Sequence, residues 1–155
     1  MRNEQKGFSL IELLIVVAII LIIAAIAIPN LLRSKIAANQ ASAVGSLRSL
    51  NTACIAYSTS YGTFPAALTN LGPVGSGNAS STSADLIDSV LSAGTKSGYT
   101  FVYSAGSLNQ SYSITASPVT AATTGQNMYY TDQSGVIRSD TSGTGAGSAS
   151  TPIGN

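Results

Sequence analysis

Histidine is absent from this chain of 155 residues, and cysteine occurs only once, as Cys54. A single cysteine excludes an intrachain disulfide, and a chain without histidine cannot assemble the usual ligand sets for zinc. Histidine is also the side chain that most often serves as a general base, so Cys54 has no histidine to activate it as a nucleophile. We therefore expect no enzyme, no metal site and no cofactor, and we expect Cys54 to be a small buried apolar residue.

Charge is also scarce, because Asp, Glu, Lys and Arg together make up 8% of the chain against about 25% in a typical globular protein. The formal net charge is +1, so little electrostatic repulsion separates one copy from another and self-association is favoured. The seven basic residues are scattered and do not form the dense stripe that displaces phosphate counterions. Specific nucleic-acid binding is therefore not expected.

The N-terminal part of the chain is rich in apolar residues. Residues 8–28 form an apolar run of 21 residues, which as a helix rises about 31 Å, close to the ~30 Å of a bilayer's hydrocarbon core. This run predicts a membrane-spanning helix. Pro29 follows it, and because proline lacks a backbone donor and collides with the preceding turn, we expect a kink or a locally melted turn there and not the end of the helix.

An apolar stripe continues the helical pattern beyond Pro29. Seven residues recur at alternating spacings of four and three, which is typical of one helix face, and only the glutamine among them is polar: Ile36, Gln40, Ala43, Leu47, Leu50, Cys54 and Tyr57. Residues 29–57 are therefore expected to form the amphipathic half of the same helix. About fifty helical residues span about 75 Å, more than a domain of this size, so the apolar half should protrude.

The segment after this helix is punctuated by glycine and proline. Residues 58–98 are therefore expected to form a connecting loop that contains one short helix. We expect Asp85 to cap this helix, Leu86 and Val90, together with Leu91, to face the core, and Gly94 to end it.

The last third of the chain predicts a small sheet. Four runs of strand length are rich in β-branched and aromatic residues: residues 99–104, 111–117, 128–131 and 136–139. They read as two antiparallel hairpins, the second closed by a tight turn at residues 132–135. Packed on the amphipathic half of the long helix, a sheet within residues 99–139 gives an α+β fold. The tail, residues 140–155, lacks apolar periodicity and is expected to be flexible.

Two features of the predicted sheet have alternative interpretations. Asp132, Ser134, Gly135 and Asp140 could offer oxygen ligands to calcium, but their spacing does not fit an EF-hand loop, so a simple β-turn is favoured. Five tyrosines could form an adhesive surface or a charge-transfer path, but we expect them to pair across strands: Tyr99, Tyr103, Tyr112, Tyr129 and Tyr130.

Glu12 is the one charged residue inside the apolar run, where a lone carboxylate costs about 2.5 kcal/mol or more. The stretch around it, KGFSLIELLIVVAII at residues 6–20, joins a basic residue, a glycine, an aromatic residue and a glutamate to a long apolar helix. This stretch resembles the class III signal of type IV prepilins and their pseudopilin relatives. The likeness runs from Arg2 to Arg33 and includes the proline at Pro29.

The resemblance implies that a prepilin peptidase cuts between Gly7 and Phe8 on the cytoplasmic side. Residues 1–7 would then be a leader removed on processing, and the new amino group of Phe8 would be methylated. The resemblance further implies that Glu12 pairs with the Phe8 ammonium of a neighbouring subunit and sets the axial register of an incoming subunit. A helix brings residues four apart to nearly the same face, so the Phe8 ammonium is also a physically suitable partner for the Glu12 carboxylate.

By this resemblance the chain is expected to be a structural subunit of a type IV pilus. It would enter the bacterial inner membrane as a prepilin and polymerise into an extracellular filament, of the kind used in cell adhesion, motility or secretion. Its expected partners are other copies of itself, the prepilin peptidase, membrane lipid before assembly, and an inner-membrane assembly platform with its ATPases. The ATPases must be separate proteins, because the chain has no phosphate-binding glycine loop followed by Lys-Ser/Thr.

Four alternatives remain open from the sequence. The chain could be a pseudopilin of a type II secretion system, or a membrane-anchored periplasmic binding module that never polymerises. Its N-terminus could be an ordinary secretory signal, since Arg2 and Lys6 are basic and residues 25–27 read Ala-Ile-Ala, but Glu12 and the length of the apolar run argue against it. A plain single-pass anchor would leave the buried carboxylate unexplained.

Overall fold

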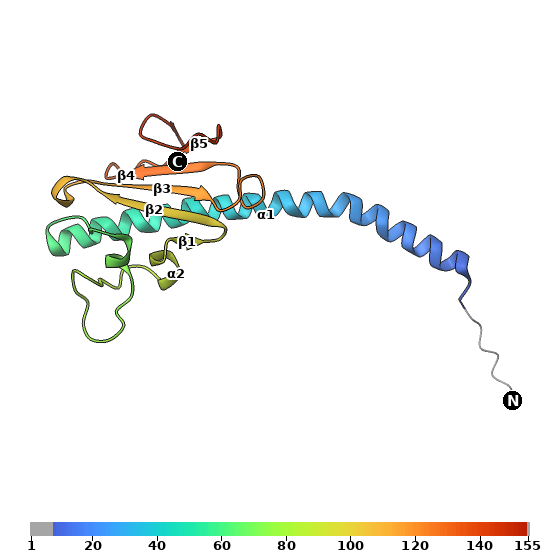
Figure 1. The fold of residues 1–155 in the computed structure, drawn as a ribbon, viewed down its shortest axis with the longest axis horizontal. Coiled ribbons are helices and arrows are strands. Elements are labelled where there is room, and N and C mark those ends of the chain that lie inside the picture. Colours follow the sequence, from blue (N-terminus) through green and yellow to red (C-terminus); the bar gives the residue numbers. More distant parts are fainter. Residues whose placement is uncertain (1–7, 155) are drawn as a thin grey trace. The chain divides into compact units, whose positions relative to one another are not determined.

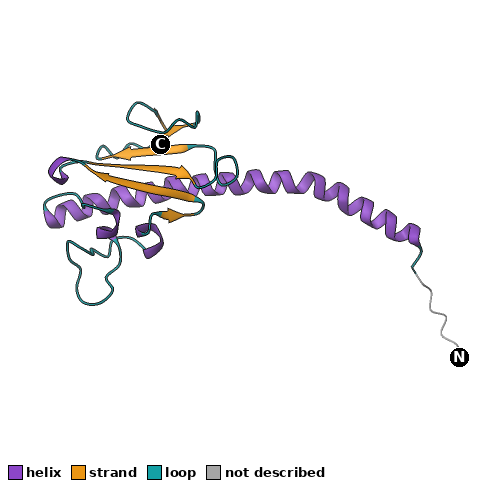
Figure 2. Ribbon diagram, in the orientation of Figure 1, coloured by secondary structure: helices purple, strands orange, loops and turns teal. Residues whose placement is uncertain are grey.

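A computed structural model describes residues 8–154. Its longest element is helix α1, Leu10–Tyr61, which has 52 residues and contains Pro29 (Figures 1 and 2). The chain divides into two compact units, one that ends at Lys35 and one that begins at Ile36, and each is described by itself. The local kink expected at Pro29 stays a prediction.

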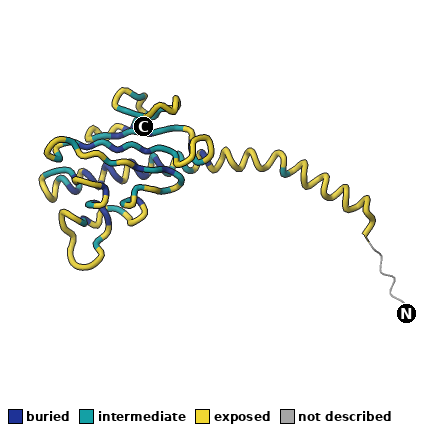
Figure 3. Tube along the Cα trace, viewed as in Figure 1, coloured by how far each residue is buried: buried dark blue, intermediate teal, exposed yellow. Residues whose placement is uncertain are grey.

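In the first unit, α1 carries large apolar side chains all around its surface, and nearly all of them are exposed (Figure 3). Among the described residues, α1 is the one helix whose length and composition would let it cross a membrane, and its most apolar stretch is not buried anywhere in the structure. A helix that is apolar on all sides is typical of a membrane span or of a helix packed among others.

In the second unit, a sheet lies along the C-terminal part of α1 (Figure 2). Its six strands follow one another in chain order, and every neighbouring pair is antiparallel. The strands are β1 (Thr95–Lys96), β2 (Tyr99–Ala105), β3 (Tyr112–Pro118), β4 (Met128–Asp132), β5 (Arg138–Asp140) and β6 (Thr151–Pro152). Short helices lie in the connections: η1 (Leu68–Leu71), α2 (Ser89–Ser92) and η2 (Ser107–Asn109).

The core forms where the apolar stripe of α1 meets one face of the sheet. On β3 the buried residues Tyr112, Ile114 and Ala116 alternate with less buried ones, as expected for a strand with one face against a core. The α1 side supplies a matching set of buried residues: Ala43, Leu47, Leu50, Ala53, Cys54 and Tyr57. The predicted helix face is therefore the face that packs, and the expected α+β fold is confirmed.

Gln40, the polar member of the stripe, lies at the edge of this core. With its amide turned to match its neighbours, the side-chain oxygen accepts from the backbone N–H groups of Gln126 at 3.1 Å and Asn127 at 3.2 Å. The glutamine therefore ties α1 to the segment before β4, which explains why a polar residue is tolerated on an apolar face.

The structure corrects the prediction for the short helix. Asp88, and not Asp85, is the residue that caps α2, because its Oδ1 accepts from the Leu91 backbone N–H at 2.8 Å. Asp85 has a left-handed backbone with φ 55°, which lies outside the extended conformation typical of an N-cap. Of the three residues expected to face the core, Leu91 is buried, while Leu86 and Val90 are 40% and 53% exposed.

The sheet also has two more strands than the four expected. The additional strands β1 and β6 contain two residues each and lie at the two edges of the sheet. β6 falls within the segment predicted to be a flexible tail, where the Ile153 backbone N–H donates to the Ile137 carbonyl at 2.9 Å. β5 begins at Arg138, two residues later than predicted.

Candidate functional site

The N-terminal end of α1 holds Glu12 in a defined local geometry. Its Oε2 accepts from the backbone N–H of Ser9 at 2.9 Å, and the Ser9 Oγ lies 3.4 Å from the backbone nitrogen of Ile11, which donates to it. A serine before the first turn and a glutamate three residues later form a capping box, in which each side chain satisfies a free backbone donor. The sequence analysis missed this role, although the Ser-x-x-Glu signature at residues 9–12 was visible.

The position of Glu12 also places its negative charge beside the free N–H groups of the first helical turn. Carboxylates are stabilised there by the helix dipole. The helix dipole does not offset the full cost of a carboxylate in apolar surroundings, and the side chains around Glu12 on α1 are exposed apolar groups such as Leu10, Ile11 and Leu13. When lipid or another apolar surface covers this helix, the carboxylate still needs a cation to neutralise it.

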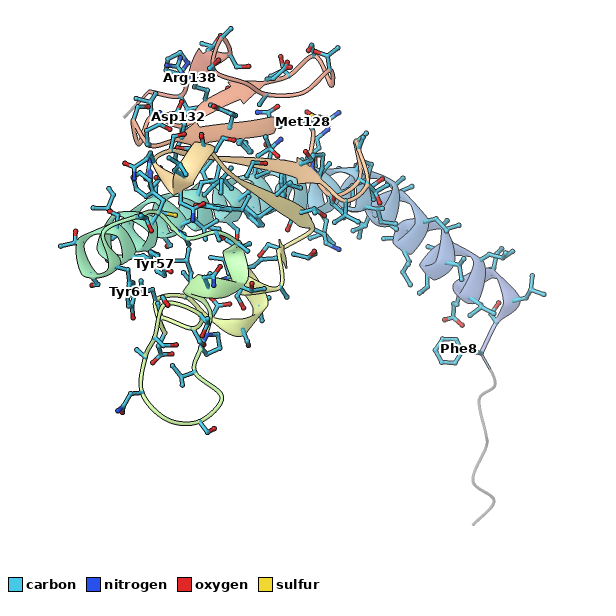
Figure 4. All side chains as sticks on the ribbon, turned by 60° about the vertical axis from the view of Figure 1, so that its left-hand side comes forward. Phe8, Tyr57, Tyr61, Met128, Asp132 and Arg138 are labelled. Atoms are coloured by element: carbon cyan, nitrogen blue, oxygen red, sulfur yellow. The ribbon has the colours of Figure 1, made fainter. Side chains whose placement is uncertain are left out.

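Phe8 immediately precedes this capping box, with its ring exposed beside the end of α1 (Figure 4). The predicted cleavage junction joins Phe8 to Gly7, which lies outside the described residues. The predicted cleavage, the methylation of Phe8 and its pairing with Glu12 therefore stay predictions.

The other residues considered from the sequence lie in the second unit and have structural roles. Cys54 is fully buried, and burial raises the pKa of its thiol to about 12, so it is a neutral packing group as expected. The residues around Asp132 form the predicted turn: the Ser134 N–H donates to Asp132 Oδ1 at 2.9 Å and the Gly135 N–H to the Asp132 carbonyl at 2.9 Å. Within residues 8–154, no group of three or more Cys, Asp or Glu side chains is placed to hold a metal ion.

Four of the five sheet tyrosines pack against one another across strands, and Tyr130 lies opposite Thr115 and Arg138. Tyr103 on β2 stacks on Tyr112 on β3, with ring centroids 5.9 Å apart. Tyr99 and Tyr129 approach to 6.0 Å from the two strands that flank β3. Hydroxyl groups are satisfied by backbone carbonyls, since Tyr99 donates to Asn127 at 2.8 Å and Tyr103 donates to Pro65 at 2.7 Å. These rings are part of the core and its border.

A buried hydrogen-bond network between α1 and the sheet was not predicted. Asn51 donates from Nδ2 to Thr131 Oγ1 at 2.8 Å, and its Oδ1 accepts from the Tyr112 hydroxyl at 3.1 Å. All three side chains are buried. The position of Asn51, one turn after Leu47, was the available signal that it faces the core.

The N-terminal segment that carries Phe8 and Glu12 matches the family model described as the prokaryotic N-terminal methylation motif, over residues 2–28. The first of the curated relatives, the "Type IV major pilin protein PilA" of Myxococcus xanthus, is 54% identical over 50 residues. Over part of its length, the chain is therefore similar to type IV major pilins.

Two further curated relatives are similar to the chain over stretches of comparable length. The "Type IV wide pilus major component PilA4" of Thermus thermophilus is 67% identical over 39 residues, and the "Type IV major fimbrial protein FimA" of Dichelobacter nodosus is 51% identical over 59 residues. The three matches cover 32%, 25% and 36% of this chain. They span 23%, 29% and 37% of the relatives' own lengths, so the chain matches well under half of each curated relative. No solved structure matches the chain significantly.

Proposed function

We propose that this chain is the structural subunit of a type IV pilus, made as an inner-membrane precursor, cleaved after Gly7 and polymerised into an extracellular filament. The observation that supports the proposal most strongly is the exposed, all-round apolar surface of α1 combined with the methylation motif at its start. Such a surface is covered by lipid before assembly and by the helices of other copies afterwards. Its transfer therefore costs little hydrophobic free energy.

In this proposal, cleavage supplies the cation that Glu12 lacks. Removal of residues 1–7 leaves an ammonium group at Phe8, whereas in the precursor this nitrogen is a neutral amide. The Glu12 carboxylate would pair with the Phe8 ammonium of a neighbouring copy, so that only a correctly registered subunit neutralises both charges. An unpaired acidic or basic group in hydrocarbon costs about 2.5 to 3.5 kcal/mol, which is sufficient to select one axial register.

The proposal also assigns the remaining parts of the chain. The sheet and its connecting loop would form the outer coat of the filament, where weakly charged Ser, Thr and Tyr side chains meet the surroundings. Cleavage and methylation would require a prepilin peptidase, and extension and retraction would require an inner-membrane platform with separate ATPases. In this assembly the chain is a substrate and a building unit, and carries out no catalysis itself.

The test is to shear the cells, separate the filament fraction from the membrane pellet, and identify the N-terminal peptide of the chain in each by mass spectrometry. A methylated Phe8 terminus in the sheared fraction is the expected result. The same terminus confined to the pellet would favour a pseudopilin or a non-polymerising module. A chain that begins near residue 28 would instead identify a secretory signal and overturn the proposal.

A further inference from the structure

The charged side chains of residues 8–154 are unevenly satisfied. Four of the five carboxylates in this range accept hydrogen bonds from nearby groups: Glu12, Asp88, Asp132 and Asp140. The fifth, Asp85, is exposed and accepts no hydrogen bond and forms no ion pair within this range. The cations show a similar division, since Lys96 pairs with Asp88 at 2.9 Å and Arg138 donates to the Ser150 carbonyl at 3.2 Å.

The three cations without a partner in the described range all lie on α1: Arg33, Lys35 and Arg48. The second unit thus presents one free carboxylate, Asp85, and one free cation, Arg48, while the part of α1 in the first unit presents Arg33 and Lys35. The two kinds of charge are complementary between copies of the chain.

Asp85 immediately precedes Leu86, which lines a hollow that can accept another side chain. The hollow has a volume of about 530 Å³ and lies between α1, which contributes Ser42, Gly45 and Ser49, and the loop that contains Leu86 and α2. Leu86 also borders a second hollow of about 420 Å³ further along the same side of α1. A side chain added at Gly45 would meet nothing within 4 Å, so the floor of the hollow is open. The lining combines the apolar side chains of Leu86, Ile87 and Leu91 with serines and with Asp88 and Lys96, which pair with each other. The apolar part of the lining and the free carboxylate of Asp85 favour a partner that offers an apolar group beside a cation.

Leu31 and Lys35 of a neighbouring copy offer this combination. The two residues are four apart on α1 and therefore share one helix face, and Leu31 is 72% exposed. Arg33 lies two positions from each of them and points to the other side of the helix. Arg33 lies instead on the same side of α1 as Ile36, three residues later, which is buried. Of the two free cations in the first unit, Lys35 is thus the one that shares a face with the exposed Leu31.

We propose that the hollow beside Asp85 receives the Leu31–Lys35 face of another copy, with Leu31 against Leu86 and Lys35 paired with Asp85. This inference rests on the proposed polymerisation and adds the head-to-helix contact that fixes neighbouring copies. The contact lies outside the apolar core of the filament, so it acts together with the pairing of Glu12 and does not replace it.

Engineered cysteines test this contact directly in sheared filaments. The pair Leu86→Cys with Leu31→Cys should give oxidised dimers and higher ladders on non-reducing gels. The matched control, Leu86→Cys with Arg33→Cys, carries the second thiol on the opposite face and should give none. Cys54 is fully buried and contributes no background. Equal cross-linking in both pairs, or none in the first, would overturn the docking contact while leaving the filament itself established.

A second pair of variants covers the case in which the cysteine chains fail to assemble. Gly45→Ala should leave filament yield within about twofold of wild type, whereas Gly45→Leu fills the hollow and should lower it at least about fivefold. Both changes favour the isolated helix, so a difference between them reports docking and not folding. Equal yields would refute the contact, and absence of the wild-type chain from the sheared fraction would refute the proposed function itself.

Charge removal gives a third readout. Asp85→Asn keeps a residue that tolerates a left-handed backbone, and Lys35→Gln keeps the length of the side chain. Each change should lower filament yield about threefold, and the double variant should be no worse than either single one, because the second change removes a partner already lost. Fully multiplicative losses would mean that the two charges act independently, against the proposed pair.

Discussion

The strongest prediction about stability concerns Asn51, which joins α1 to the sheet through two buried hydrogen bonds. The change Asn51→Ala leaves the Thr131 hydroxyl without its donor and the Tyr112 hydroxyl without its acceptor. Thr131 is 0% exposed and Tyr112 is 3% exposed, so water cannot easily replace the lost partner. The cost should therefore come from stranded polar groups more than from lost packing.

The magnitude follows from the number of groups affected. A buried polar group left without a partner costs about 1 to 3 kcal/mol, and here there are two, so the free energy of unfolding should fall by about 2 to 6 kcal/mol. Thr131→Val removes only one of the two bonds and should cost less. In the Asn51→Ala background Thr131→Val should cost about 1 kcal/mol less than in the wild type, because its hydrogen bond is already gone.

The assay is urea unfolding of the full-length chain in detergent, followed by the near-ultraviolet circular dichroism of its tyrosines. Thr52→Ala is the matched control, since Thr52 is an exposed neighbour that bonds only to the Arg48 carbonyl at 3.0 Å, and it should change stability by less than about 0.5 kcal/mol. A loss below about 1 kcal/mol for Asn51→Ala, or the absence of coupling to Thr131, would refute the reasoning.

Three further predictions concern the helix start, a close approach and pH. Glu12→Gln keeps a side chain that can complete the capping box but removes its charge, so processing should remain near normal while the amount of sheared filament falls about tenfold, as for Glu12→Ala; normal filament yield from Glu12→Gln would show that the charge is not needed. Gly125→Ala should destabilise the chain by about 1 to 3 kcal/mol in urea unfolding, because a Cβ at this position would overlap the Tyr99 phenol; an unchanged midpoint would contradict the close approach. Burial raises the pKa of Tyr99 to about 12 from 10.0, so its contribution to stability is complete below pH 10 and is lost as the pH rises towards about 12. In an alkaline titration followed by tyrosinate absorbance, the wild type should show an ionisation step that coincides with unfolding, and Tyr99→Phe should lack this step. Identical titration curves for the two proteins would contradict the raised pKa of Tyr99.

The long helix and its packing face could be predicted because their signal is periodic and local. The alternating spacing that includes Leu47 and Cys54 depends only on which side chains are apolar, and the structure buries both. Glu12 was singled out because a charge in an apolar run is rare. Its capping role was not predicted, because it depends on the Ser9 backbone N–H and not on the charge that sets Glu12 apart.

Other features depend on contacts that the local pattern does not specify. Asp85 and Asp88 are both capping residues by type, and only the left-handed backbone of Asp85 decides between them. Strand β6 has only two residues, which pair with β5. Two residues are too few to form a recognisable run of β-forming residues, so the sequence pattern does not predict this strand. Asn51 is polar in sequence but buried in the fold, since Thr131 and Tyr112 from distant strands complete its hydrogen bonds.

The short outer strands of the sheet affect how copies of the chain behave when they are crowded together. Both outer strands contain only two residues, and β6 includes Pro152, which has no N–H to donate to a further strand. Long, flat outer strands can pair with those of neighbouring molecules and seed disordered aggregates, whereas edges this short offer almost no template for such pairing. Copies brought to very high local density would therefore meet through side chains and helices, and their sheets would stay separate. This would favour a reversible assembly over an amyloid-like one.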